Sequence, residues 1–269
     1  MTDIKFVLTG FFVLMLLFAC KKDQSKRMAD IQELERYYHL VEADSDSPIA
    51  DSTDLIISAV AGPDRVPSPA CLAVLPTGEV FVGVDQIGSL GKEPGKGSIV
   101  RLVDRDHDGQ YEEFTEFVQV DNPRGIMPVE DKVFVLHTVF NEQTGEADRM
   151  DLVELEDKNH DGISDRPADP LIKNICSPAS LRSRGTDHAT NGIRMGIDGW
   201  IYIAVGDFGF YEAEDRSGQK MTMLGGGIVR VRPDGTEMEV YAHGTRNIYD
   251  VAIDPFMNIF TRGNTNDGG

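Results

Sequence analysis

The sequence predicts an all-β protein, a β-propeller built from four-stranded blades. Three observations support this prediction. The 269 residues include 27 glycines and 13 prolines, which favour many turns and short strands. Apolar strands meet turns rich in Asp, Gly or Pro and then continue into β-branched and aromatic strands, as hairpins do. The same unit recurs four times, which indicates a propeller rather than a sandwich.

Aromatic residues mark the repeats along the chain. Phe81, Phe134, Tyr202 and Phe260 occupy matching places, at spacings of 53, 68 and 58 residues. A third strand follows in the first three units, expected at 99–103, 152–155 and 228–232. About three and a half units fit in the chain, whereas a closed ring has typically four to eight blades. We therefore expect a partial ring of about three to four blades, the N-terminal part of a larger protein.

The N-terminal residues are typical of an export signal. Residues 1–19 contain a short apolar run, Phe6–Phe18, that matches a secretory signal better than a membrane span. Leu17–Cys20 resembles the bacterial lipobox, in which cleavage leaves a lipidated Cys20. We expect the protein to lie outside the cytoplasm, lipid-anchored to a bacterial membrane on its periplasmic side or at the cell surface. An ordinary signal peptide or an uncleaved anchor is the alternative.

The remaining chain divides into two parts. Residues 20–53 are polar and predict a linker with one short amphipathic helix, because apolar residues recur every three or four positions. Residues 54–269 hold the partial propeller. The whole chain carries a net charge of −19. An acidic surface of this size repels phosphate backbones, so we expect no nucleic-acid partner. Cys71 and Cys176 predict either one disulfide or two buried thiols.

Two acidic loops follow predicted third strands. Asp and Asn alternate in them ahead of a glycine, as calcium-binding loops require, although neither loop has a glutamate at its twelfth place. The candidate ligands are Asp104, Asp106, Asp108 and Glu112 in the first loop, and Asp157, Asn159, Asp161 and Asp165 in the second. Solvated turns capped by their own side chains are the alternative. Calcium at these places would be structural and distant from catalysis.

The connections that enter the inner strands carry the most informative side chains. Alignment of the repeats makes Asp121, His188 and Arg246 positional equivalents. If the repeats are blades, these three side chains lie at one end of the central channel. An acid, an imidazole and a guanidinium facing one cavity suit the binding and oxidation of a polar substrate.

The chain resembles the glucose/sorbosone dehydrogenase family, six-bladed propellers that use pyrroloquinoline quinone (PQQ). The matching stretches are Asp187-His188, Asn191–Asp207 and Gly244–Asn247, and the likeness covers residues 68–269. The chain is also similar to the N-terminal propeller of large secreted bacterial proteins of the membrane-bound dehydrogenase type. Some of those proteins continue into a cytochrome, which suggests an electron-accepting partner.

The resemblance implies roles for individual residues. His188 falls at the family's general base, with Asp187 tuning it, and Arg246, Asn247 and Asn191 fall at cofactor-binding places. The substrate would be a sugar or polyol, and the family's cofactor calcium would lie near Arg262, where a cation departs from the pattern. The alternatives are a non-catalytic propeller that binds carbohydrate or protein, and an incomplete fragment without independent activity.

Overall fold

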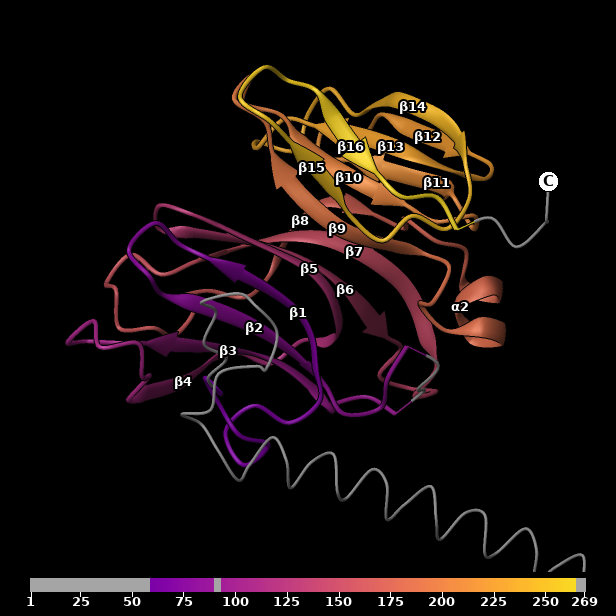
Figure 1. The fold of residues 1–269 in the computed structure, drawn as a ribbon. Coiled ribbons are helices and arrows are strands. Elements are labelled where there is room, and N and C mark those ends of the chain that lie inside the picture. Colours follow the sequence, from indigo (N-terminus) through magenta and orange to yellow (C-terminus); the bar gives the residue numbers. More distant parts are fainter. Residues whose placement is uncertain (1–58, 90–92, 265–269) are drawn as a thin grey trace, which may run out of the picture. The chain divides into compact units, whose positions relative to one another are not determined.

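The computed structural model describes residues 59–89 and 93–264 (Figure 1). In these residues the secondary structure is almost entirely β, as predicted, and residues Val60–Gly269 form one compact unit. The expected signal peptide, the lipidated Cys20 and the amphipathic helix all lie outside the described residues. No helix of the described part is long and apolar enough to span a bilayer.

The first blade is a four-stranded antiparallel sheet whose strands pair in sequence order. Its strands are β1 (Pro69–Val74), β2 (Val80–Asp85), β3 (Gly97–Val103) and β4 (Glu113–Val118). The β1–β2 hairpin turns at Gly78, whose φ of +93° is open to glycine and strained for other residues.

The second blade repeats this order and then gains two further strands. Its own strands are β5 (Asp121–Val129), β6 (Lys132–Phe140), β7 (Ala147–Glu156) and β8 (Asp169–Lys173). The hairpin β11 (Phe210–Asp215) and β12 (Lys220–Met223) pairs onto β8 and makes a six-stranded sheet. This hairpin is an insertion from the third blade, and the sequence did not predict it.

The third blade is complete and a fourth begins after it. The third blade contains β9 (Thr190–Met195), β10 (Ile201–Val205), β13 (Gly226–Val231) and β14 (Glu239–Thr245). β15 (Val251–Ile253) and β16 (Ile259–Thr261) form a two-stranded sheet. One short helix, α2 (Pro178–Arg184), joins β8 to β9 and begins at the N-cap Ser177. The fold is thus a β-propeller, as predicted.

Side chains on β10 alternate between the cores on the two faces of its blade. In β10, Ile201 and Ile203 pack into the core shared with the second blade. Tyr202 and Ala204 point the other way, into a core with Trp200, Ile248 and Val251. A strand buried on both faces in this way has period two and needs apolar residues throughout. Each large buried side chain contributes roughly 1.5–3 kcal/mol to stability.

The first strands of successive blades lie next to one another: β1 beside β5, β5 beside β9, and β9 beside β15. Glycines permit this approach. A Cβ on Gly192 would stand 2.1 Å from Asp250 Oδ1, and a Cβ on Gly125 would stand 3.2 Å from the Ile193 amide nitrogen. The segments that enter these inner strands are consequently brought together, and they include the candidate functional residues.

Candidate functional site

The candidate site is built by three segments at one end of the blades. The first is the connection from α2 to β9, which contains Asp187 and His188. The second follows the end of β10 and contains Asp207, and the third precedes β15 and contains Arg246–Asp250. Antiparallel pairing places all three at the same end, because first strands begin where second strands finish.

His188 is held by a carboxylate that sequence reasoning did not select. Its Nδ1 lies 2.5 Å from Asp207 Oδ1, and its ring stacks on Phe208 with centroids 5.5 Å apart. An ionised carboxylate only accepts hydrogen bonds, so this contact requires a hydrogen on Nδ1. In the tautomer with a single hydrogen, Nε2 then has the lone pair. The Arg184 Nη2 atom lies 3.4 Å from Nε2.

Asp187 lies on the other side of the imidazole. Its Oδ2 is 3.4 Å from His188 Nε2, and its Oδ1 accepts a hydrogen bond of 2.9 Å from the Tyr249 hydroxyl. The Asn247 side chain donates to the Asp187 backbone carbonyl at 3.1 Å. Burial, followed by the hydrogen bond to Asp187, raises the pKa of Tyr249, so its phenol remains a donor at neutral pH. Asp187 is therefore placed to stabilise a protonated His188.

Asp207 also links His188 to Arg246. Its Oδ2 lies 3.9 Å from Arg246 Nε, so the carboxylate faces a base on one side and a cation on the other. Two buried atoms here have no hydrogen-bond partner among the described residues: Arg246 Nη1 and Asn247 Oδ1. Buried polar atoms are normally paired, so these two are available to a bound molecule.

A cavity of about 580 Å³ adjoins this cluster. It is lined by Asn247, Tyr249, Asp250, Arg262, Gly263 and Asn264. Tyr249 and Asn247 connect the cavity to Asp187, and through it to His188. The predicted neighbour Asn191 does not line this space but a second cavity, with which Tyr249 and Asp250 also make contact.

The expected convergence of Asp121 with His188 and Arg246 is wrong. Asp121 Oδ1 accepts backbone hydrogen bonds from Gly95, Lys96 and Gly97 at 2.8, 3.0 and 3.3 Å. Its side chain lines a separate cavity, beside the buried His137. Its Oδ1 thus caps the neighbouring loop at residues 95–97. The carboxylate of the site is Asp207 instead.

Two residues of the site were missed by sequence reasoning, Asp207 and Tyr249. Asp207 follows Gly206 at the end of a strand, and a lone Gly-Asp is common in turns. Tyr249 lies in the stretch that precedes β15, among residues with no pattern of their own. Asp250, close to Arg246 in the sequence, forms its ion pair with Arg194, whereas the acidic neighbour of Arg246 is Asp207.

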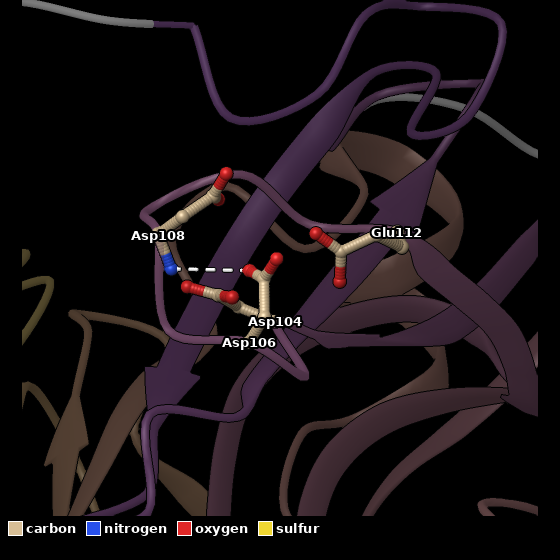
Figure 2. A group of neighbouring side chains, drawn as sticks. All are labelled: Asp104, Asp106, Asp108 and Glu112. Carbon is tan, nitrogen blue, oxygen red and sulfur yellow. Dashed lines mark hydrogen bonds between the residues drawn. The ribbon is translucent and has the colours of Figure 1, made fainter.

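The first acidic loop lies at the opposite end of the blades, since it follows a third strand, β3. Figure 2 shows Asp104, Asp106, Asp108 and Glu112 gathered on this loop. One oxygen from each carboxylate lies within 4.8 Å of the others, a grouping that could hold a metal ion. Asp104 Oδ1 is buried and has no hydrogen-bond partner among the described residues. Oxygen-only ligands are those that calcium prefers.

The second acidic loop does not form an equivalent group. Asn159 Nδ2 donates to Asp165 Oδ1 at 3.0 Å, and Asp165 Oδ2 accepts from the Lys158 backbone at 2.6 Å. Both carboxylate oxygens of Asp157 accept backbone hydrogen bonds, from Asp161 at 3.2 Å and from Gly162 at 3.0 Å. The loop thus caps itself, which was the alternative considered from the sequence. The carboxylates of the first loop accept matching backbone hydrogen bonds, from Gly109, Asp108, Gln110 and Arg105, so the two loops differ in the convergence of their carboxylates and not in this capping.

Both cysteines of the described region are free thiols. Burial raises the pKa of Cys71 and of Cys176 to about 12 each. Neither is a thiolate at neutral pH, so neither is activated for nucleophilic or redox chemistry.

Comparison with known proteins relates the chain to solved structures, although it spans only about 60% of the length of the first of them. A gluconolactonase from Xanthomonas campestris is 14% identical, with a TM-score of 0.48, over 80% of this chain and 60% of that one. A putative oxidoreductase (glucose dehydrogenase) from Thermus thermophilus is 22% identical, with a TM-score of 0.48, over 73% and 58%. Regucalcin from Agrobacterium tumefaciens is 16% identical, with a TM-score of 0.46, over 75% and 55%.

Among curated proteins, none matches this chain. A family match covers residues 43–268, which is most of the chain, and it is not to the glucose/sorbosone dehydrogenases that the sequence resembles. The chain belongs to the family described as Domain of unknown function (DUF7133).

Proposed function

We propose that the His188 end of the propeller is the active site of a dehydrogenase that oxidises a hydroxyl group of a sugar or polyol. The observation that carries this proposal is the contact of 2.5 Å between His188 Nδ1 and Asp207 Oδ1. A carboxylate at Nδ1 fixes the tautomer in which Nε2 is basic, and this arrangement is how proteins prepare a histidine as a general base.

His188 then removes the hydroxyl proton of the substrate at Nε2. The imidazolium that forms is stabilised by Asp207 at Nδ1 and by Asp187 Oδ2, 3.4 Å from Nε2. General-base catalysis of this kind contributes typically about 10²–10⁴-fold to a rate. Tyr249 holds Asp187 in place through its hydroxyl.

The hydride acceptor in this proposal is PQQ, which supplies a quinone carbon when it is bound. Arg246 fits such a group, because its donor Nη1 is buried without a partner among the described residues. Asn247 offers only the acceptor Oδ1, since its Nδ2 donates to the Asp187 carbonyl. A guanidinium pairs well with an anionic tricarboxylate. The residues near Arg262 do not fit the cofactor calcium that the resemblance implies, because a guanidinium lines that cavity.

We further propose calcium at the first acidic loop, where it would stabilise the turn between β3 and β4. Asp104, Asp106, Asp108 and Glu112 are the ligands in this proposal. The second loop is not proposed as a calcium site, because its acidic side chains do not converge as those of the first loop do, and Asp165 Oδ1 accepts a hydrogen bond from the Asn159 amide.

We also propose that the chain is exported and anchored by a lipid on Cys20. A cytochrome outside the cytoplasm would then accept the electrons. Feeding cells a radiolabelled fatty acid tests the anchor. The wild-type chain would incorporate the label and the Cys20→Ala variant would not. Equal labelling of both would exclude this cysteine.

Dye reduction by the full chain, loaded with PQQ and calcium and offered a panel of sugars and polyols, tests the proposed activity. His188→Ala should lower turnover by about 10²-fold or more. His243→Ala is the matched control, because His243 is an exposed histidine in β14. Sugar binding without turnover would favour the non-catalytic propeller, and turnover untouched by His188→Ala would contradict the assigned base.

A further inference from the structure

A second cavity lies between the inner strands and plays no part in the proposed oxidation. Its volume is about 360 Å³, and it is lined by residues of β1, β5 and β9 and by the turn before β15. The polar side chains in its wall are Arg124, Asn191, Arg194, Tyr249 and Asp250. Contributions from four blades place this cavity at the centre of the propeller.

Two guanidinium groups in its wall each retain an unused N–H. Arg124 donates from Nη2 to Asp85 Oδ2 at 2.6 Å and from Nε to Thr186 Oγ1 at 2.9 Å, which leaves Nη1 without a partner among the described residues. Arg194 donates from Nη1 to the Ile193 carbonyl and from Nη2 to Asp250, which leaves its Nε without a partner among the described residues. The ion pairs hold both groups in place and do not use all their donors.

Asn191 supplies a third, independent observation. It is only 4% exposed, it lines the cavity, and its Nδ2 makes no hydrogen bond with the described residues. A buried amide without a partner costs about 1–3 kcal/mol. Such a group is expected where a ligand completes its hydrogen bonding.

We propose that this cavity binds a small carboxylate-bearing molecule. Fixed guanidinium donors recognise a carboxylate by charge-assisted hydrogen bonds, and the Asn191 amide adds a neutral donor. A metal cation is disfavoured, because two guanidiniums face the space and its carboxylate, Asp250, is paired with Arg194. In a chain of net charge −19, arginines directed into a central cavity also oppose the general repulsion of anions.

This site does not depend on the proposed oxidation, because His188, Asp207 and Arg246 do not line the cavity. Tyr249 and Asp250 line both spaces, so the two ligands would lie close together. Binding can therefore be measured in His188→Ala protein without any quinone.

Calorimetric titration of the full-length His188→Ala protein with gluconate and with sorbitol tests the proposal. The two probes are open-chain six-carbon polyols that differ in a carboxylate at one end. We expect gluconate to bind at least ten times more tightly than sorbitol. Equal affinities, or tighter binding of inorganic phosphate than of gluconate, would overturn the proposed class.

Three variants locate the binding. Arg194→Gln and Asn191→Ala should each weaken gluconate binding by about tenfold or more, since a hydrogen bond to a charged group contributes about 1.5–3 kcal/mol. Arg105→Gln, in the acidic loop at the other end, is the matched control and should leave affinity unchanged. Asn191→Ala should also leave the melting temperature nearly unchanged, because its amide has no partner to lose. The proposed site would be overturned if Arg105→Gln weakened gluconate binding, or if Arg194→Gln and Asn191→Ala left it unchanged.

Discussion

The two acidic loops share one sequence pattern and differ in structure. Each follows the third strand of its blade and each places Asp or Asn at alternate positions before a glycine. The first, residues 104–112, brings four carboxylates together. The second, residues 157–165, does not, although in both loops the acidic side chains accept backbone hydrogen bonds from their own loop. In the second loop Asp165 also accepts a hydrogen bond from the Asn159 amide. A ligand pattern therefore specifies possible donors, and the conformation of the loop decides whether they converge.

A cation from another blade accounts for part of this difference. Arg101, on β3, places its Nη1 2.6 Å from where a Cβ on Gly162 would stand, next to the second loop. Its guanidinium is held there by Glu79, at 2.9 Å. A fixed positive charge beside a loop opposes the binding of a divalent ion. In the first loop Arg105 is exposed, and its guanidinium donates to Glu113.

Removing two ligands from the first loop should have the largest effect. Asp104→Asn combined with Asp106→Asn lowers the ligand charge by two, and we expect calcium affinity to fall by about 100-fold. Terbium luminescence and calorimetry measure this change. Asp157→Asn combined with Asp161→Asn is the matched control in the second loop. If the control lost as much affinity as the test variant, the contrast between the loops would be wrong.

Calcium should also raise the thermal stability of the wild-type chain. At a calcium concentration of 100 times Kd the free energy of unfolding rises by about 2.7 kcal/mol. For a unit of this size the melting temperature should then rise by roughly 5–10 °C. Scanning calorimetry with and without calcium measures the shift. A rise that persists in the Asp104→Asn, Asp106→Asn protein would place the stabilising ion elsewhere.

The second loop should gain affinity from a single change. Asn159→Asp replaces the amide that donates to Asp165 with a carboxylate, which both adds a negative charge to the ligand set and frees Asp165 Oδ1. We expect calcium binding to strengthen by about tenfold from its starting level, measured by calorimetry on the Asp104→Asn, Asp106→Asn background. Asp148→Asn, outside both loops, controls for net charge. An unchanged affinity would mean that Arg101 alone blocks the site.

Arg105→Gln should give the smallest effect, visible in a pH titration. The hydrogen bond from Arg105 holds the pKa of Glu113 below its ordinary value of 4.5. A depressed pKa stabilises the folded state above the ordinary value, and this stabilisation is lost as the pH falls through the folded-state value. In Arg105→Gln protein the Glu113 pKa should return upward, as followed by NMR. A Glu113 pKa that stays low would assign the shift to another group.

The blades were predictable because their signal is local. Alternation in β10, with Ile201 and Ile203 on one face and Tyr202 on the other, satisfies both neighbouring cores and is visible in a few consecutive residues. The hairpins were predictable for the same reason. By contrast, α2 has only seven residues, too few to establish a helical period.

The site was only partly predictable because its contacts join distant segments. His188 and Arg246 were found from their equivalent places in the repeats, and the structure connects them through Asp207. No local pattern shows that a residue after β10 meets a histidine before β9. Asp121 failed for the reverse reason: it occupies the equivalent place, but a nearby loop at residues 95–97 takes its carboxylate. The position of a residue in the repeat predicts where its backbone lies. It does not predict which group its side chain will contact.

The insertion hairpin β11–β12 has a consequence for the order in which parts of the propeller unfold. It leaves the third blade, pairs Glu214 with Lys173 and Asp215 with Ile172 on β8, and so fastens one blade to the outer edge of another by backbone hydrogen bonds. Asp215 also accepts a hydrogen bond from the backbone amide of Met238, which connects the hairpin to the third blade. Amide protons of these two blades should therefore exchange with deuterated solvent as a single group, while those of β15 and β16 exchange sooner.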